Sequence, residues 1–418
     1  MKDFDSLEQS KIEFVREKFL ETAKLFGFNF MAPSPLELVS VIEAKSGQAI
    51  RDEIYFFKDK GDREIALRFD FTVGLTRYVV EQKSMKMPAK ICAFGGVWRY
   101  DEPQKGRYRY FHQWDLEIYG KPSLESDAEI IEFTSKFFSK LNLKNITIDV
   151  SHRKLVESIV AKIFERTDNQ TIGDIFRAID KIQKKKKEEI ISEYTQKGYS
   201  KDNLEKILEF SQIKGQPEQI ESLFDVSGIP AWDELKELLL ALKNRGVTNT
   251  RINFGIVRGL DYYSGIVFEA FDSSTSYGAL VGGGRYDSLP KVFGRDDIGA
   301  TGVAGGVERI ILSLESQGLQ STQPTTKVSV LFVTEEMSRP AMSIASLLRE
   351  KEIQIEIDLL GRPFKKQIEN ASNSKFAIII APKEFSDNKV IIKNMSDGKE
   401  TITQIDLLLA NPKSLFTL

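Results

Sequence analysis

The stretch of residues 94–120 reads FGGVWRYDEPQKGRYRYFHQWDLEIYG and combines strand-like runs with a dense group of cations. Pro103 and Gly106 mark a turn between the two runs, which predicts a β-hairpin. The turn region carries four cations, Arg99, Lys105, Arg107 and Arg109. An arginine fork binds two phosphate oxygens at once and stays charged, so the loop suits a phosphate ligand. A solvated surface hairpin would have the same composition.

Four further segments combine small, charged and aromatic residues. They are ALRFDFTVGLTRYV at 66–79, RGLDYYSGIVFE at 258–269, GGGRYDSL at 282–289 and GATGVAGGVERIIL at 299–312. Glycines allow a ligand or a second strand to approach the backbone closely, although a glycine run is also typical of a plain strand–helix corner. The sequence lacks a glycine-rich phosphate-binding fingerprint of the Rossmann or P-loop kind.

Composition bounds the class of protein. A chain of 418 residues suggests about two to four domains. With 41% hydrophobic residues, full-length disorder is excluded. A single cysteine, Cys92, excludes an internal disulfide framework and a cysteine-based zinc site. The 59 Lys and Arg against 61 Asp and Glu give a net charge of −2, which does not by itself indicate a nucleic-acid partner.

No targeting or membrane signal is visible in the sequence. The first ten residues are polar and of mixed charge, and no run approaches the roughly 20 apolar residues of a membrane helix. We therefore expect a cytoplasmic protein with no membrane partner.

The composition and the hydrophobic periodicity change several times along the chain. Helical periodicity covers residues 10–26, and long helical patterns fill residues 154–248, which predict a helical subdomain. The basic run Lys184–Lys187 lies there and reads as a solvated helix face, with an RNA contact as the alternative. Residues 316–326 resemble a linker, and strand and helix patterns alternate from residue 328, which predicts a small α/β domain with a mixed sheet.

Together these segments resemble the histidyl-tRNA synthetases, a family of class II aminoacyl-tRNA synthetases. Residues 94–120 are similar to class II motif 2 and residues 299–312 to motif 3. The RGLDYY and GGRYD sequences are similar to two histidine-specific signatures of the family, and their joint presence makes the resemblance specific. Motif 1 is the weakest match, near residues 27–37.

The resemblance implies an α+β fold. Its class II catalytic domain is a six-stranded antiparallel β-sheet flanked by helices, and an α/β anticodon-binding domain follows at the C-terminus. We expect the catalytic domain over residues 1–153 and 249–318, a helical insertion over 154–248, and the anticodon-binding domain over 327–418. Because motif 1 forms a dimer interface in the family, a homodimer is also implied.

The implied reaction joins L-histidine to tRNA(His) in two steps. The histidine carboxylate attacks the α-phosphate of ATP, pyrophosphate leaves, and the histidyl group then moves to the 3′ end of the tRNA. A carboxylate is already ionised at pH 7, so the first step needs positioning and charge neutralisation rather than a protein base. Mg²⁺ is expected to accompany ATP, and no metal ligand is assigned in the chain.

The resemblance also implies residues for ATP. The catalytic pair is Arg99 and Arg258, both at the α-phosphate, and Arg258 would also contact the substrate carboxylate. Asp101 replaces a usual Glu at the adenine and is one methylene shorter. The ATP-binding residues are Arg99, Asp101, Arg107, Phe111 and Arg309.

For the amino acid, Asp70 and Gln113 would hold the α-ammonium and Glu117 would accept from the imidazole N–H. The histidine-binding residues are Asp70, Thr72, Gln113, Glu117, Arg258, Tyr262, Tyr263 and Tyr286. The residues expected to contact the tRNA acceptor end are Gln104, Lys105 and Arg109. We expect His112 to be a satisfied neighbour of the site and His152 to have no catalytic role.

Two alternatives remain at this stage. A non-catalytic paralogue, such as the regulatory subunit of ATP phosphoribosyltransferase, would share the catalytic body. Such paralogues typically lack the C-terminal domain and degrade RGLDYY, both of which are present here. An RNA-binding or sensor module without chemistry is disfavoured by the intact arginines Arg99, Arg258 and Arg309.

Overall fold

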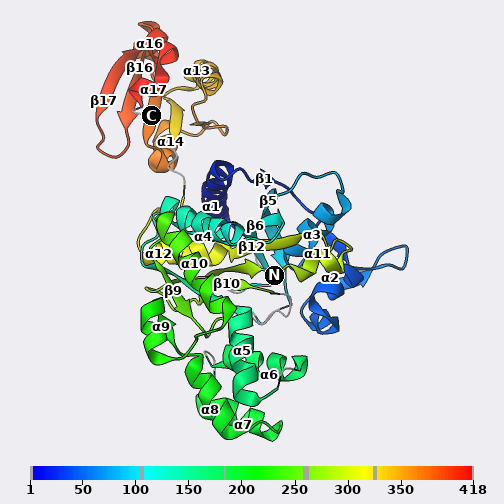
Figure 1. Cartoon of the computed structure of the whole chain (residues 1–418). Coiled ribbons are helices and arrows are strands. Elements are labelled where there is room, and N and C mark those ends of the chain that lie inside the picture. Colours follow the sequence, from blue (N-terminus) through cyan, green and yellow to red (C-terminus); the bar gives the residue numbers. More distant parts are fainter. Residues whose placement is uncertain are drawn as a thin grey trace. The chain divides into compact units, whose positions relative to one another are not determined.

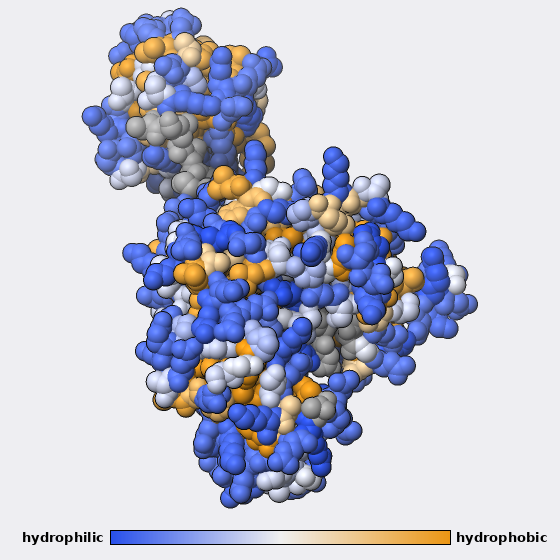
Figure 2. Space-filling view, in the orientation of Figure 1, coloured by the Kyte–Doolittle hydropathy of each residue, from blue (hydrophilic) through white to orange (hydrophobic). Residues whose placement is uncertain are grey.

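The structure, a computed structural model, describes residues 3–100, 102, 108–166, 168–182, 185–257, 263–322 and 327–416. The chain divides into two compact units, Met1–Gln323 and Pro324–Leu418, here called the N-terminal and C-terminal units (Figure 1). Hydrophilic residues cover most of the face of each unit that Figure 2 shows. Within the described ranges, none of the helices is both long enough and apolar enough to cross a membrane.

A nine-stranded sheet forms the centre of the N-terminal unit (Figure 1). Its six middle strands pair antiparallel, which confirms the expected catalytic sheet. Short strands extend it on both sides. On one side β1 pairs in parallel with β5; on the other β9 pairs in parallel with β7, and β8 pairs antiparallel with β9 at the edge. In spatial order the strands are β1 (Asn29–Phe30), β5 (Ala89–Trp98), β6 (Tyr110–Gly120), β12 (Gly299–Gly306), β11 (Ala279–Arg285), β10 (Ile266–Asp272), β7 (Ile146–His152), β9 (Thr250–Asn253) and β8 (Lys214–Gly215).

Strands β5 and β6 form the hairpin that the opening stretch predicts. Their register runs from Ala89 opposite Tyr119 to Trp98 opposite Tyr110. Residues 103–107 of the connecting loop lie outside the described residues, so the predicted cationic loop itself stays a prediction.

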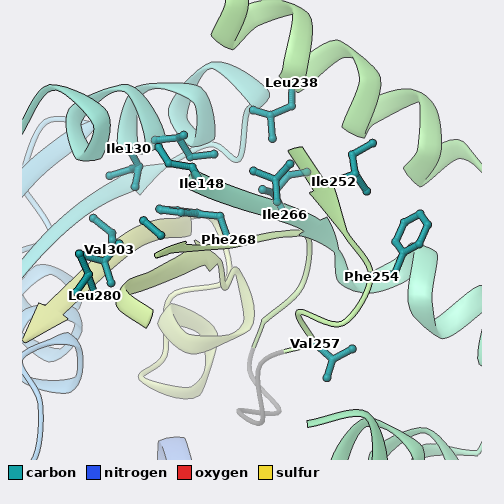
Figure 3. Close-up of a cluster of buried hydrophobic side chains, with 14 of the residues drawn as sticks. Ile130, Ile148, Leu238, Ile252, Phe254, Val257, Ile266, Phe268, Leu280 and Val303 are labelled. Atoms are coloured by element: carbon teal, nitrogen blue, oxygen red, sulfur yellow. The ribbon is translucent and has the colours of Figure 1, made fainter. Parts of the chain in front are cut away.

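Long amphipathic helices cover one face of this sheet. They are α1 (Ser6–Leu25), α4 (Leu124–Lys140), α10 (Pro230–Asn244) and α12 (Val307–Ser316). Figure 3 shows Ile130 of α4 and Leu238 of α10 beside the strand residue Ile148, and all three are fully buried. Burying a side chain of this size stabilises the fold by about 1.5–3 kcal/mol. This face is therefore the main core of the unit.

The opposite face carries α3 (Thr72–Glu81) and α11 (Ser288–Val292), with a smaller apolar cluster that includes Phe71, Leu75 and Tyr119. A separate three-stranded sheet is formed within residues 36–67 of the N-terminal unit. It consists of β2 (Leu36–Leu38), β4 (Glu64–Leu67) and β3 (Phe56–Lys58), in that order, and α2 (Val39–Ser46) and η1 (Gln48–Asp52) lie between β2 and β3 in the sequence.

Helices occupy most of the sequence from residue 153 to residue 244, while the helical insertion over 154–248 stays a prediction. Besides α10 this stretch contains α5 (Arg153–Phe164), α6 (Asn169–Lys181), α7 (Lys187–Gln196), α8 (Lys201–Phe210) and α9 (Pro217–Leu223). Two described lysines of the basic run are paired, Lys185 with Glu193 at 3.3 Å and Lys187 with Glu209 at 3.0 Å. These pairs agree with a solvated helix face, while Lys184 lies outside the described residues.

The C-terminal unit has the mixed sheet that the sequence predicts, with five strands in the order β14-β13-β15-β16-β17. The first three strands are parallel and the last three antiparallel. Its elements are β13 (Val328–Phe332), η2 (Glu335–Met337), α13 (Ser338–Glu350), β14 (Ile355–Ile357), α14 (Phe364–Asn370), η3 (Ala371–Asn373), β15 (Phe376–Ile380), α15 (Pro382–Ser386), β16 (Lys389–Asn394), β17 (Glu400–Gln404), α16 (Ile405–Ala410) and α17 (Pro412–Leu415).

Candidate active site

A row of polar side chains lies on the face of β6 opposite the main core. Successive residues of a strand point to opposite faces, so Trp114 and Leu116 enter the core while their neighbours face α3. The row contains Gln113, Asp115 and Glu117, whose exposed fractions are 4%, 0% and 2%. Buried polar groups are costly unless they are hydrogen-bonded, so each member of the row needs a partner.

Arg99 lies at one end of this row, immediately after β5. Its Nε donates to the Phe69 carbonyl at 3.1 Å, and its Nη2 donates to Gln113 Oε1 at 3.1 Å. The guanidinium carbon is 5.2 Å from the centroid of the Phe111 ring. The structure thus brings together three residues that the sequence predicted for the site, Arg99, Phe111 and Gln113.

Asp115 is a member of the row that the sequence reading did not select. It accepts from Gln113 Nε2 at 2.8 Å and from Thr72 Oγ1 at 3.3 Å. Because Gln113 gives its amide nitrogen to Asp115 and its oxygen to Arg99, these two contacts fix which way the amide faces. The signal for Asp115 was present in the alternation of polar and apolar residues through HQWDLEIYG, positions 112–120.

Asp70 and Thr72 lie where the chain enters α3. The backbone N–H of Val73 donates to Asp70 Oδ1 at 3.3 Å, in the first turn of the helix. Since the Phe69 carbonyl accepts from Arg99, this entry segment lies beside the Arg99 end of the row. Both predicted residues are therefore close to the predicted arginine in the fold.

Glu117 lies further along the row and accepts a hydrogen bond from the Tyr286 hydroxyl. The ring of Tyr263 is edge-on to that of Tyr286, with centroids 6.4 Å apart and planes at 83°. Burial holds the pKa of the nearby Tyr119 well above its ordinary value, and the charge of Glu117 raises it further. Glu117, Tyr263 and Tyr286 thus form the second cluster of predicted residues.

Gly302 of β12 is the residue directly opposite Glu117 in the sheet. A Cβ atom at this position would clash with the Glu117 carboxylate and approach the Leu116 carbonyl to 2.8 Å. The glycine is therefore required by close packing against the acidic side chain. This gives one glycine of the 299–312 segment a physical reason.

Three further residues lie near the ends of β6 and β12. Arg309, in the first turn of α12, donates from Nη1 to the Ala279 carbonyl at 2.9 Å. The guanidinium carbon of Arg109 is 4.6 Å from the centroid of the Tyr100 ring. His112 meets Glu308 through Nδ1 at 3.0 Å and through its backbone N–H at 2.9 Å, in agreement with its expected place as a satisfied neighbour.

Six residues predicted for the site lie outside the described residues, so their predicted roles stay predictions. They are Asp101, Gln104, Lys105, Arg107, Arg258 and Tyr262.

The described part of the chain holds no group of three or more His, Cys, Asp or Glu side chains that could bind a metal ion. Cys92 is buried in β5, and burial raises the pKa of its thiol to about 12, so it is an inert core residue at neutral pH.

Comparison with known proteins identifies the family. The family model described as histidyl-tRNA synthetase matches residues 1–310, and the model described as anticodon binding domain matches residues 327–410. The chain belongs to the histidyl-tRNA synthetase family. The resemblance drawn from the motifs is thereby confirmed, together with the class II α+β fold.

Curated relatives of this synthetase family match nearly the whole chain. A histidine–tRNA ligase of Pyrococcus furiosus is 34% identical and covers 97% of this chain and 95% of its own length. A histidine–tRNA ligase of Pyrococcus horikoshii is 32% identical, with 99% and 97% covered. The chloroplastic/mitochondrial histidine–tRNA ligase of Arabidopsis thaliana is 30% identical, with 96% and 83% covered.

Solved structures agree on the fold. Histidyl-tRNA synthetase from Nostoc sp. PCC 7120 superposes with a TM-score of 0.80 at 22% identity, covering 96% of this chain and 95% of that one. An ATP phosphoribosyltransferase regulatory subunit/histidyl-tRNA synthetase from Bacillus halodurans C gives 0.74 at 20% identity, with 91% and 97% covered. The fold alone therefore does not separate the synthetase from its paralogue.

Proposed function

We propose that the chain is a histidine–tRNA ligase, which activates L-histidine with ATP and transfers it to the 3′ end of tRNA(His). Curated ligases at 30–34% identity over nearly the full length favour this function over the non-catalytic paralogue. The observation that carries it is the buried polar row on β6, bounded by Arg99 at one end and by the Glu117–Tyr286 pair along the strand.

Arg99 is the described residue best placed for the activation step. Its Nε and Nη2 are anchored by Phe69 and Gln113, so the guanidinium needs little reorganisation when charge builds on the α-phosphate. Loss of one such preorganised donor costs about 2.7–4 kcal/mol in the transition state. We propose Arg258 as its partner at the α-phosphate, and Arg107, Arg309, Asp101 and Phe111 for the rest of ATP.

The remaining residues of the row suit histidine. Asp70, Thr72 and Gln113 lie beside Arg99, where the α-ammonium and carboxylate of an amino acid would be placed next to the phosphate. Glu117 lies further along and can accept from an imidazole N–H. A buried acceptor rejects side chains that leave it unpaired, which provides selectivity. We propose Tyr262, Tyr263 and Tyr286 as the walls of this pocket.

ATP is the nucleotide substrate, and we propose that Mg²⁺ enters with it as the Mg–ATP complex. Mg²⁺ usually keeps several waters and binds through substrate phosphates with one or two carboxylates, so it does not need a dedicated protein cage. We assign Mg²⁺ no ligand in the chain.

We infer that the C-terminal unit reads the tRNA anticodon, and that the loop after β14 contacts its bases. Leu359 and Leu360 are 77% and 72% exposed. Asp358 Oδ2 accepts the backbone N–H groups of Leu360 at 3.1 Å and Arg362 at 2.8 Å, which orders this loop. An adjacent cavity is lined in part by Arg349, Arg362 and Asn370. Apolar tips beside polar side chains suit unpaired bases, which are recognised by stacking and edge contacts.

We propose that Gln104, Lys105 and Arg109 contact the acceptor end of the tRNA.

A homodimer is part of the proposal. Apolar side chains on three short strands are 41–49% exposed, and exposed apolar side chains of this size often mark a contact with a partner. They are Phe30 of β1, Leu36 and Leu38 of β2, and Phe56 and Phe57 of β3. A second copy of the chain would cover them. Sedimentation of the purified chain at micromolar concentration should give twice the monomer mass, and Phe57→Glu should shift it toward the monomer.

We also propose the domain division into residues 1–153 with 249–318, 154–248, and 327–418, and a cytoplasmic location.

Histidine-dependent exchange of pyrophosphate into ATP tests the activation step directly. The purified chain should catalyse exchange with L-histidine and should charge tRNA(His) transcript. If the folded chain showed no exchange, the ligase function would be excluded and the non-catalytic paralogue would become the favoured alternative.

A further inference from the structure

Arg285 ends β11 and extends its side chain to the helix-covered face of the sheet. Its Nη1 is 2.7 Å from Glu234 Oε1 on α10, and its Nη2 contacts Asp127 Oδ2 on α4. The Arg285 and Asp127 side chains are 12% and 1% exposed. The guanidinium therefore joins the end of β11 to two helices, and its planar fork suits two carboxylates at once.

Glu234 is held in turn by His152. The backbone N–H of Lys154 donates to His152 Nδ1 at 3.2 Å, which leaves the proton on Nε2. That nitrogen is 3.2 Å from Glu234 Oε2 and donates to it. His152 is 1% exposed, so this contact lies in the interior. The second carboxylate that meets Arg285 is thus fixed from its far side.

The next residue along the chain is Tyr286, whose hydroxyl donates to Glu117 in the proposed histidine pocket. Hydrogen bonds fix the backbone on both sides of this tyrosine. Ser264 N–H donates to the Arg285 carbonyl at 2.8 Å, and Asp287 N–H donates to Ser264 Oγ at 3.0 Å. Consecutive residues point to opposite faces, so Arg285 is anchored on one face while Tyr286 enters the pocket on the other.

We propose that Arg285 is a positioning residue for histidine recognition: by joining β11 to Asp127 and Glu234, it fixes Tyr286 against Glu117. This inference rests on the proposed ligase function. Arg285 does not touch substrate, so it acts only through Tyr286. It follows that Glu234 influences how tightly histidine is bound, although it lies on α10, in the helical part of the sequence between β7 and β10.

The test uses pyrophosphate exchange by the full chain with three single variants, and with Arg285→Lys in a Tyr286→Phe background. Arg285→Lys keeps the charge but cannot hold two carboxylates as a fork, and Glu234→Gln removes one partner while leaving Arg285 and Asp127. Glu237→Gln is the matched control, because Glu237 is an exposed carboxylate of the same helix α10. Thermal unfolding and circular dichroism establish that each variant folds.

Arg285→Lys should raise the KM for histidine about tenfold and Glu234→Gln about threefold, with the KM for ATP within about twofold. Glu237→Gln should match the parent. In a Tyr286→Phe background, Arg285→Lys should add less than about twofold, because residues that act through one contact are not additive. A general loss of structure would instead affect both substrates.

An unchanged KM for histidine in folded Arg285→Lys, an equal rise for ATP, or full additivity with Tyr286→Phe would overturn the inference. Should Arg285→Lys fail to fold, Glu234→Gln decides in the same way. If the parent chain itself shows no histidine-dependent exchange, the ligase function fails and the inference with it. A parent that exchanges, with variants that do not change histidine binding, refutes the positioning role alone.

Discussion

Gly302 and Glu117 lie directly opposite each other on β12 and β6, and the space that a Cβ atom of residue 302 would need is filled by the Glu117 carboxylate. The acidic side chain can thus lie flat over the neighbouring strand within the sheet. Substitutions at this pair therefore test the proposed pocket without touching the arginines that we propose for phosphate binding.

Gly302→Ala should abolish histidine activation or reduce it at least a hundredfold. The added methyl group must displace Glu117 or the backbone, and overpacking of this kind costs about 1–3 kcal/mol in stability. Gly61→Ala is the control, at an exposed glycine where the nearest atom to an added Cβ would be Asp59 Oδ1 at 3.4 Å. Pyrophosphate exchange and thermal unfolding of both variants measure the effect. Equal activity of the two would contradict the proposed position of Glu117.

Glu117→Gln should lower kcat/KM for histidine by about 10–100-fold, because a hydrogen bond to a charged group is worth about 1.5–3 kcal/mol. The amide keeps the shape of the side chain, so loss of charge rather than of volume is tested. The KM for ATP should stay close to that of the parent. If exchange with histidine were unchanged, the charge of Glu117 would not contribute to histidine recognition.

Asp115→Asn tests the residue that the sequence reading passed over. Asp115 accepts from both Gln113 and Thr72, so an amide in its place puts an N–H against one of these donors. We expect the Gln113 amide to lose its fixed orientation and the KM for histidine to rise about tenfold. Asp52→Asn, at an exposed aspartate of η1, is the control. A histidine KM equal to that of the parent would show that Gln113 is oriented without Asp115.

The alternation of side chains explains why most of the row could be predicted. A strand has a period of two, so Gln113, Asp115 and Glu117 share a face once β6 is recognised. The family motif predicted Gln113 and Glu117 but not Asp115, which lies between them. The strands at the sheet edges were missed for another reason: β1 and β8 have only two residues each, too few for any periodicity. Strand β17 was missed because its residues are mostly exposed.

The Arg285 contacts could not be predicted from one sequence. Asp127 and Glu234 lie 158 and 51 residues away along the chain. Each meets Arg285 only because α4 and α10 pack on the same face of the sheet, which depends on the tertiary fold. The GGRYD motif drew attention to Tyr286, whereas the arginine before it carried no local sign of two buried partners.

Arg99→Lys should lower kcat for exchange by about 10²–10³-fold while changing the KM for histidine less. Lysine retains a charge, but its donors share one nitrogen, so it cannot contact Phe69 and Gln113 from two separate nitrogens as the planar guanidinium does. Arg63→Ala, at a side chain that is 72% exposed, is the control. Single-turnover formation of the adenylate separates the chemical step from binding. A kcat like that of the parent would remove Arg99 from the activation step.

The acid dependence of stability tests the buried network. The hydrogen bond from His152, with the charge of Arg285, lowers the pKa of Glu234 to about 2. A carboxylate with a depressed pKa adds stability above its ordinary pKa near 4.5, and that stability is lost as the pH falls toward 2. Glu234→Gln should therefore be less stable than the parent at pH 7 by about 1–2 kcal/mol, after allowing for solvent screening.

This difference should shrink as the pH falls below 4.5, and urea unfolding of both proteins between pH 7 and pH 3 measures it. Burial raises the pKa of Asp127 to about 6 and the charge of Glu234 adds to that rise, so the same pair of curves in an Asp127→Asn background separates the contribution of Glu234 from that of Asp127. Glu237→Gln provides the baseline, because its curve should run parallel to that of the parent. A difference for Glu234→Gln that stayed constant down to pH 3 would mean that Glu234 adds stability through packing and not through its charge.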